Sequence, residues 1–190
     1  MAGDKEAERA LDAWLAAAAR TGDARAFALL VKRWHPRLTA HAWRLLGDAD
    51  AARDAAQDGW AEIVRALPRL DDLSAFGAWA YRIVSRRCAK AIGGAVRRRR
   101  LAESVAAEPP AAAADEAEAS DTGRLRAAIA ALPPEQRAAV ALFHFEEMSV
   151  AETAVALNVP AGTVKTRLMH ARRKLRALLD GDETCAISTK

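Results

Sequence analysis

Apolar residues recur at intervals of three and four along most of the chain, which is the spacing of one face of an α-helix. In the first half, capping residues mark where such helices begin and end. The pattern predicts four helices there: Lys5 to about Arg20, one capped by Asp23, one from Asp48 or Asp50 to about Leu67, and one capped by Ser74.

Helix-breaking residues interrupt two of these segments. Pro36 lies inside the second helix, where a missing backbone N–H predicts a kink or a local break. Gly93 and Gly94 lie near the end of the fourth helix and predict that it frays or bends before a run of arginines.

The second half predicts a short helix marked by Leu125 and Ile129, then one opened by Pro134, because proline is tolerated in a first turn. Residues 149–152 read SVAE, a capping box that predicts the start of another short helix. A tight turn follows at 158–162, and Thr163 is then expected to cap a last helix reaching about Leu179.

A short helix, a turn and a basic helix form the DNA-binding helix-turn-helix arrangement. Five apolar residues of the last helix should face inward: Val164, Leu168, Ala171, Leu175 and Leu178. The candidate DNA contacts on this helix are Lys165, Thr166, Arg167, Met169, His170 and Arg173. The alternative is an ordinary amphipathic helix with a basic face.

Charge divides the chain into blocks. Residues 82–100 carry only basic charges, residues 101–123 only acidic ones, and residues 163–178 only basic ones. The acidic stretch has few large apolar residues and two adjacent prolines, which is typical of a linker. We therefore expect an all-α protein of two helical domains, with boundaries at 1–100, 101–122 (a flexible acidic linker), 123–180 and 181–190 (a polar tail).

Composition excludes several classes of protein. No apolar run has the length of a membrane span, and the first residues do not resemble a signal peptide. Cys88 and Cys185 match no metal or redox spacing, so a cytoplasmic location is expected. The four histidines show no metal-ligand spacing, and no nucleophile or phosphate-loop pattern occurs. We expect no catalytic residue, metal, cofactor or small-molecule substrate.

Two features of the first half have a functional and a structural interpretation. Asp54, Gln57 and Asp58 share one face of the third helix, which is either a docking surface or a solvated face. All five tryptophans lie in this half, and an aromatic side chain beside basic residues could stack on bases. For Trp79 a place in the core is the favoured interpretation.

Together these motifs resemble the bacterial extracytoplasmic-function (ECF) sigma factors. Residues 132–137 (LPPEQR), 148–152 (MSVAE) and 160–168 (PAGTVKTRL) look like region 4 of that family. Residues 54–58 (DAAQD), 76–79 (FGAW) and 81–83 (YRI) look like its region 2. The resemblance covers residues 22–179 apart from the linker.

The resemblance implies an RNA polymerase subunit that selects promoters. Region 2 would bind the β′ clamp helices of core RNA polymerase through Asp54, Gln57 and Asp58, and region 4 would contact the β flap. Region 4 would read the −35 element of promoter DNA, and an anti-sigma factor, often membrane-anchored, would hold the chain inactive until a stress or signal. The residues implied for the −10 element are Arg82, Arg86, Arg87, Lys90, Arg97 and Arg98.

The sequence departs from the family pattern at several positions. Arg86 and Lys90 replace residues that the family usually has near the −10 bases, so unusual −10 specificity is expected. Glu146 and Glu147 stand where Glu-Gly is common. Two other functions remain open, a helix-turn-helix regulator that does not use polymerase and an enzyme. The regulator leaves the residue 54–58 and 76–79 motifs unexplained.

Overall fold

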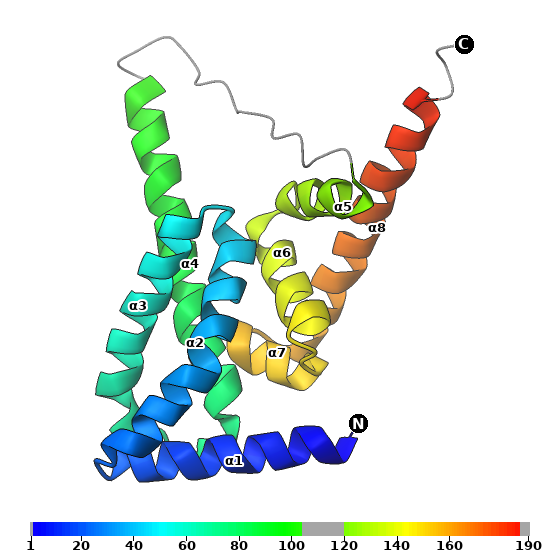
Figure 1. Cartoon of the computed structure of the whole chain (residues 1–190). Helices are drawn as coiled ribbons and strands as arrows, with labels where there is room; N and C mark the ends of the chain where they lie inside the picture. Colours follow the sequence, from blue (N-terminus) through cyan, green and yellow to red (C-terminus); the bar gives the residue numbers. More distant parts are fainter. Residues whose placement is uncertain (1, 104–119, 187–190) are drawn as a thin grey trace.

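The computed structural model describes residues 2–103 and 120–186, and every regular element in these ranges is a helix, as the sequence predicted. Figure 1 shows α1, α2, α3 and α4 beside α5, α6, α7 and α8. Two 3₁₀ turns (η1 and η2) and a π-helix (η4) join some of them. The bounds are α1 Ala2–Arg20, α2 Ala24–Leu46, α3 Ala49–Ala66, η1 Leu67–Arg69, η2 Leu73–Ala75, α4 Phe76–Glu103, α5 Asp121–Ala130, α6 Pro134–Val140, η4 Ala141–Phe145, α7 Val150–Leu157 and α8 Ala161–Ala186.

Acidic side chains cap α2 and α3. The Asp23 carboxylate accepts hydrogen bonds from the backbone N–H groups of Arg25 and Ala26, at 2.8 and 3.0 Å. Asp48 accepts one from Ala51 at 2.7 Å, so Asp48 and not Asp50 begins α3. Each carboxylate satisfies amide groups that the first turn of a helix leaves without partners.

The predicted local break at Pro36 and the predicted fraying at Gly93-Gly94 were wrong. Helix α2 runs through Pro36 without a break, because Trp34 and Leu38 on either side are buried and hold the helix against its neighbours. Helix α4 continues through both glycines to Glu103. The small helix penalty of glycine, about 1 kcal/mol each, does not end a helix of 28 residues.

Two predicted caps were also wrong. Asp72 accepts hydrogen bonds from the N–H and hydroxyl of Ser74 and caps the 3₁₀ turn η2 that leads into α4. Helix α8 begins at Ala161, and Thr163 donates its N–H to the carbonyl of Pro160 inside the first turn. At its other end α8 extends to Ala186, beyond the expected Leu179.

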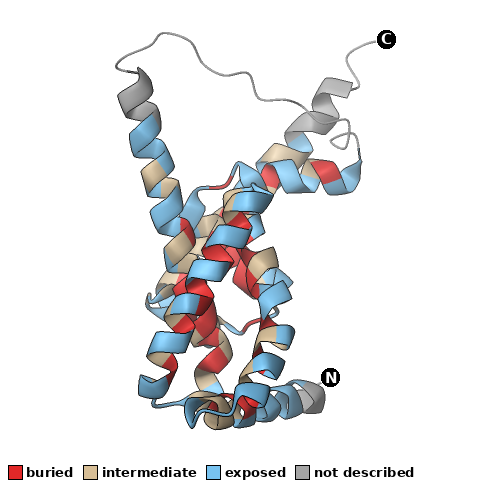
Figure 2. Cartoon of the chain, turned by 60° about the vertical axis from the view of Figure 1, so that its left-hand side comes forward, coloured by how far each residue is buried: buried red, intermediate tan, exposed pale blue. Residues whose placement is uncertain are grey.

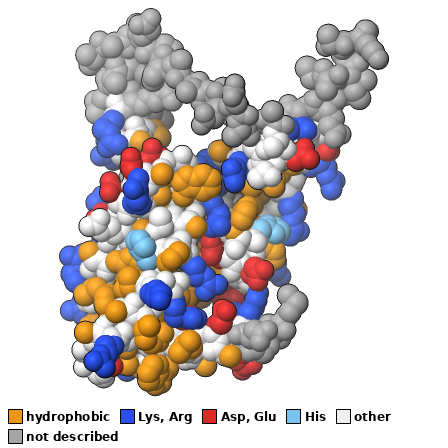
Figure 3. All heavy atoms as spheres, in the orientation of Figure 1, with side chains coloured by type: hydrophobic (Ala, Val, Ile, Leu, Met, Phe, Trp, Pro, Cys, Tyr) orange, Lys and Arg blue, Asp and Glu red, His pale blue; other side chains and the backbone are white. Residues whose placement is uncertain are grey.

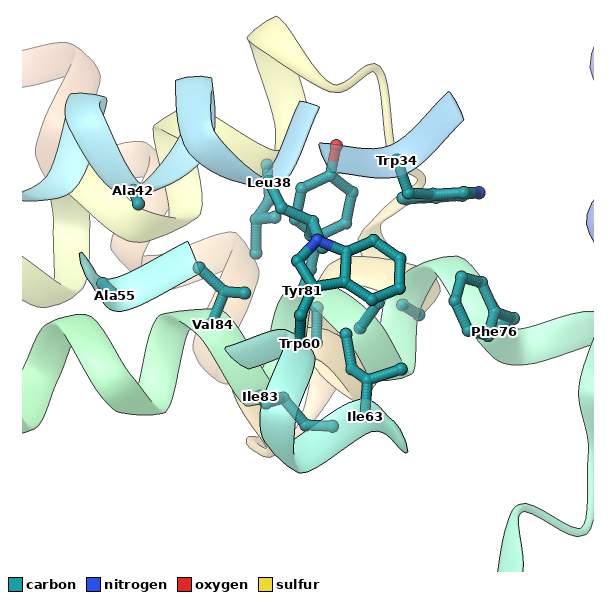
Figure 4. Close-up of a cluster of buried hydrophobic side chains, with 14 of the residues drawn as sticks. Trp34, Leu38, Ala42, Ala55, Trp60, Ile63, Phe76, Tyr81, Ile83 and Val84 are labelled. Atoms are coloured by element: carbon teal, nitrogen blue, oxygen red, sulfur yellow. The ribbon is translucent and has the colours of Figure 1, made fainter. Parts of the chain in front are cut away.

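The core of the first half lies between α2, α3 and α4 and is built around aromatic rings (Figure 4). Trp34 meets both Phe76 and Tyr81 edge to face, with ring centroids 5.6 Å apart in each pair. Gly77 allows this contact, because a Cβ there would lie 2.5 Å from Cη2 of Trp34. Trp60 is buried as well, and Trp79 packs partly buried against the cluster, whereas Trp14 is 63% exposed.

The second half has a small core of its own and also shares the large one. Leu132, Val140, Val164, Leu168 and Ala171 form the small cluster between α6 and α8. Figure 2 shows the buried residues, in red, on the inner sides of the helices. Five other buried residues of this half join the aromatic core of the first half, because α7 packs on α4. They are Ala138, Ala141, Leu142, Met148 and Ala156.

His41 is a fully buried titratable group in this core. Its Nε2 lies 2.8 Å from the Ser85 hydroxyl, and its ring lies 5.1 Å from that of Tyr81. Burial, with a smaller contribution from the charge of Arg44, lowers the pKa of His41 to about 3. The folded chain therefore holds this imidazole neutral, whereas the unfolded chain protonates it below about pH 6.5.

Acid is therefore expected to destabilise the protein through His41. Between about pH 6 and pH 4 the unfolded state binds one proton that the folded state does not, so this residue lowers the free energy of unfolding by about 1.4 kcal/mol per pH unit as pH falls. Denaturant unfolding at several pH values measures the slope. The slope should become shallower in His41→Gln and stay unchanged in His35→Gln, whose histidine is exposed; equal slopes in both variants would contradict the assignment.

Candidate DNA and polymerase interfaces

Helices α7 and α8 form the predicted helix-turn-helix. Ser149 and Glu152 make both hydrogen bonds of the capping box, at 3.2 and 2.8 Å, and so begin α7. Asn158 ends α7 in the left-handed conformation, with φ of 54°, and α8 begins three residues later. Asparagine tolerates this conformation better than most residues, so Asn158 itself favours the turn that orients α8.

The outer face of α8 presents most of the candidate DNA contacts to solvent. Lys165, Thr166, Met169 and Arg173 are exposed, whereas Val164, Leu168 and Ala171 are buried against the rest of the second half. Figure 3 shows basic side chains along the edge of the molecule where α8 lies. Such a face combines cationic groups for phosphates with side chains that reach base edges.

Four of the candidate residues on α8 make hydrogen bonds or ion pairs within the chain: Thr166, Arg167, His170 and Arg173. The Arg167 side chain is only 20% exposed and forms an ion pair with Glu135 of α6, at 2.7 Å. His170 is half-buried, and its Nδ1 lies 3.3 Å from Nη2 of Arg173. The ion pair fixes Arg167 toward α6, so among the candidate contacts the exposed cations are Lys165 and Arg173.

The three candidate polymerase-binding residues of α3 share an exposed face. Asp54, Gln57 and Asp58 are all exposed, and the Asp58 side chain is 71% accessible. The opposite side of α3 is buried through small residues and Trp60. The face therefore offers two carboxylates and an amide that the fold of this chain does not need for its own core.

The basic residues of α4 divide into two groups. Arg87 donates to Glu62 of α3 at 2.6 and 3.0 Å, and Arg86 pairs with the same carboxylate. Arg87 also lies 3.8 Å from Asp58. The other candidates for −10 DNA are exposed and carry their charge into solvent: Arg82, Lys90, Arg97 and Arg98.

A cleft of about 400 Å³ lies between the two halves, lined by α4 on one side and by α6, α7 and α8 on the other. Cys88 and Ile92 contribute to its wall, and Arg86 and Arg167 are among its polar residues. In residues 2–103 and 120–186 no cluster of His, Cys, Asp or Glu side chains is arranged to hold a metal ion. Within the same ranges no helix is long and apolar enough to cross a bilayer.

Cys88 is expected to be an inert thiol in the folded protein. The residue is fully buried, and burial raises its pKa to about 12. Because the thiolate is the reactive form, a thiol reagent at neutral pH should modify Cys88 only as fast as the chain unfolds. Labelling of a Cys185→Ser variant with and without denaturant measures this; rapid labelling of the native protein would contradict it.

Both halves of the chain are similar to known proteins. The family "Sigma-70 region 2" matches residues 30–100, and "Sigma-70, region 4" matches residues 122–175. The ECF RNA polymerase sigma factor SigM of Mycobacterium tuberculosis is 34% identical over 169 residues, which cover 88% of this chain and 84% of that protein. The chain belongs to the ECF sigma factor family. The sequence-based identification is thereby confirmed.

Other relatives agree with this assignment. The RNA polymerase sigma-H factor of Pseudomonas aeruginosa is 31% identical over 166 residues, covering 81% of this sigma factor and 86% of that protein. The solved structure of CnrH in complex with the cytosolic domain of CnrY matches with a TM-score of 0.68 and 27% identity, over 90% of this chain and 99% of that one. The sigma factor RpoE of Bartonella quintana, solved with the anti-sigma factor NepR, has the same fold (TM-score 0.67, 24% identity, 81% and 96% coverage). Sigma factors are non-catalytic initiation factors, so this one is not an enzyme.

Sequence reasoning missed one group of residues in this sigma factor, a polar cluster where the two halves meet. Glu146 accepts hydrogen bonds from the Tyr81 hydroxyl and from Arg44, the latter at 2.6 Å. Glu147 beside it has a φ of 50°. That left-handed conformation favours glycine, which explains why Glu-Gly is common at this point of the family. The glutamate at position 147 was therefore a visible departure from the family pattern. The partners of Glu146 could not be predicted, because they lie 65 or more residues away in the sequence.

Proposed function

We propose that this sigma factor directs core RNA polymerase to a small set of promoters by using its two halves on different targets. Residues 1–100 bind the polymerase and the −10 element, and residues 123–180 bind the −35 element. Residues 101–122 are the acidic linker between them, and residues 181–190 are a polar tail. The observation that carries the proposal is the exposed cationic face of α8, presented by a complete helix-turn-helix in a chain that also matches region 2.

The −35 element is read by α8 in the major groove. Lys165 and Arg173 are exposed and lie eight residues apart, about two helical turns, so both can reach phosphates or purine edges along one groove. Thr166 and Met169 lie on the face between them and are positioned for base contacts. Arg167 serves mainly to fix α8 on α6 through its ion pair with Glu135.

The core polymerase is bound through the exposed polar face of α3. Asp54 and Asp58 lie four residues apart on this face. The buried side of the same helix packs on α2 and α4. The β′ clamp helices are the proposed target, and the β flap is the target in region 4. Charged groups at such a surface raise the association rate and select the partner.

The −10 element meets the exposed cations of α4. Arg82, Lys90, Arg97 and Arg98 are the exposed cations of the predicted set without an ion pair in the described part of the chain, whereas Arg86 and Arg87 share the carboxylate of Glu62. We therefore predict that the four exposed cations supply the attraction of α4 for DNA of any sequence. It also means that Arg86 must leave Glu62 if it is to contact a base in the position that the family uses.

A protein inhibitor is the proposed regulator. CnrH is a relative of 27% identity that was solved with the cytosolic domain of CnrY, and RpoE of Bartonella quintana was solved with an anti-sigma factor. We infer that an anti-sigma factor holds this chain in the cytoplasm until a signal releases it. Because CnrY was solved as a cytosolic domain, we propose that this anti-sigma factor is anchored in the membrane.

Run-off transcription tests the function. The purified chain and core polymerase are incubated with the DNA upstream of the chain's own operon, since such factors often control their own genes. A defined transcript that requires both components is expected. A chain that binds this DNA without binding core polymerase would instead be the helix-turn-helix regulator.

A further inference from the structure

The cleft between α4 and the second half has the size and the apolar surface of a ligand site. Three large apolar side chains line it from three helices: Leu45 of α2, Ile92 of α4 and Leu157 of α7. Ala138 and Ala156 line it as well, and their small side chains leave the space open. Its volume of about 400 Å³ lies within the range of about 300–1,000 Å³ that small-molecule sites occupy.

The charged residues of the cleft are mainly basic. Arg82 and Arg86 lie one helical turn apart on the same face of α4, and Arg167 lines the cleft from α8. Glu135 is the single acidic residue among the described lining residues, so three positive charges and one negative charge leave a net charge of +2. A cleft that combines apolar walls with charges of mainly one sign concentrates ions of the opposite sign.

The arginines keep N–H groups for a ligand. Arg82 is exposed and forms no ion pair with a described residue. Arg86 pairs with Glu62, yet its side chain remains 62% exposed, and Arg167 donates to Glu135 through one nitrogen, Nη2. Because a guanidinium has five N–H donors, both paired arginines have groups left for another oxyanion. Guanidinium groups bind carboxylates and phosphates through paired hydrogen bonds, so the chemistry of this lining selects an oxyanion.

The dimensions of the cleft favour a small molecule over a helix of a partner protein. An α-helix with its side chains is about 10–12 Å wide and rises about 5.4 Å per turn, so a single turn fills roughly 500 Å³. That volume exceeds the whole cleft of about 400 Å³. A short alkyl chain or a small ring that carries one oxyanion is less bulky.

We propose that this cleft binds a small amphipathic anion, a molecule with one oxyanion group on an apolar chain or ring. The oxyanion contacts the arginine side of the cleft, and the apolar part packs against Ile92 and Leu157. Acyl carboxylates and phosphate monoesters share this chemistry. The inference goes beyond the proposed function and does not rest on it, because it concerns the free chain. Since the ligand contacts both halves of the folded chain, binding should also raise the melting temperature.

Calorimetric titration of the free chain with decanoate, below the concentration at which decanoate forms micelles, tests the proposal. Saturable binding of one decanoate per chain is expected. Decanol has the same alkyl chain without the charge, and acetate has the charge without the chain, so each should bind at least about tenfold more weakly. Decyl phosphate compares the two headgroups. Binding of either anion at one site supports the proposal, and the tighter of the two identifies the headgroup that the cleft prefers.

Two substitutions of one residue make the result specific to the cleft. Ala89 is an exposed residue of the cleft wall on α4. Ala89→Glu places a negative charge there and should weaken decanoate binding by at least about tenfold, whereas Ala89→Lys should bind decanoate at least as tightly as the parent. Both variants start from the same exposed position and add side chains of similar length, so a defect in folding would affect them alike.

A second pair of variants tests the role of the arginine side. Arg82→Ala removes the lining cation that has no ion pair and should weaken decanoate binding by about fivefold or more. Lys90→Ala removes the same charge from the same helix at an exposed position that does not line the cleft. It should leave the affinity for decanoate within about twofold of the parent.

Four results would each overturn the site. They are the failure of both anions to bind, decanol binding as tight as that of decanoate, uptake of several decanoates per chain without saturation, and equal affinities in Ala89→Glu and Ala89→Lys. The titrations need neither polymerase nor DNA. A failure of the proposed function would therefore leave them unaffected, and a failure of the ligand site would leave transcription by the parent intact.

Discussion

A Lys165→Ala/Arg173→Ala variant is expected to lose about 10- to 100-fold in affinity for promoter DNA when it is bound to core polymerase. Both side chains are exposed on the outer face of α8, and neither takes part in the core of the second half. Their loss removes about two phosphate or base contacts. The slope of log affinity against log salt concentration should therefore decrease by about 1.8, as measured by titration of labelled promoter DNA.

The control for this variant is Arg25→Ala/Arg69→Ala, which removes two exposed positive charges from the first half. It should leave the affinity within about twofold, because total charge is then equal and only position differs. Core binding should be intact in both double variants. An equal loss of core affinity in Lys165→Ala/Arg173→Ala would contradict the assignment of −35 recognition to this face.

Asp58→Arg is expected to weaken binding to core polymerase by at least about tenfold, and transcription should fall with it. The carboxylate is 71% exposed at the middle of the proposed docking face, so reversing its charge turns an attraction into a repulsion without disturbing the core. The new arginine would also repel Arg87, 3.8 Å away. Competition with a labelled sigma factor for core polymerase measures the change.

The matched control is Asp71→Arg, which makes the same charge change at an exposed position outside α3. This variant should retain core affinity, and both variants should melt at similar temperatures. If Asp58→Arg leaves the affinity for core polymerase unchanged, the α3 face is not the docking surface. If Asp71→Arg loses the same affinity, the effect comes from net charge and not from position.

Local signals in the sequence predicted much of the fold. The periodic apolar positions placed the eight α-helices of residues 2–103 and 120–186, and the capping box at Ser149 and Glu152 placed the helix-turn-helix. Both signals rest on contacts within a few residues. The inward set on α8 was confirmed for Val164, Leu168 and Ala171, which are buried. The family resemblance was likewise carried by short motifs.

The errors arose where distant contacts outweigh a local preference. Pro36 predicted a break that packing overrides in α2, and the glycine pair predicted one that its small helix penalty does not cause in α4. The ion pairing of Arg86 with Glu62 joins two helices, and no spacing along the chain reveals it. The same holds for Glu146, whose partners lie in α2 and α4 and are visible only once the two halves are assembled.

The π-helix Ala141–Phe145 sets the direction in which Glu146, the next residue, projects. A π-turn accommodates one more residue than an α-turn, and each residue of an α-helix turns the chain by about 100°. Deleting one residue from this segment would restore regular winding and rotate Glu146 by more than a quarter turn relative to α6. The winding of this one short helix therefore decides whether the Glu146 carboxylate faces Tyr81.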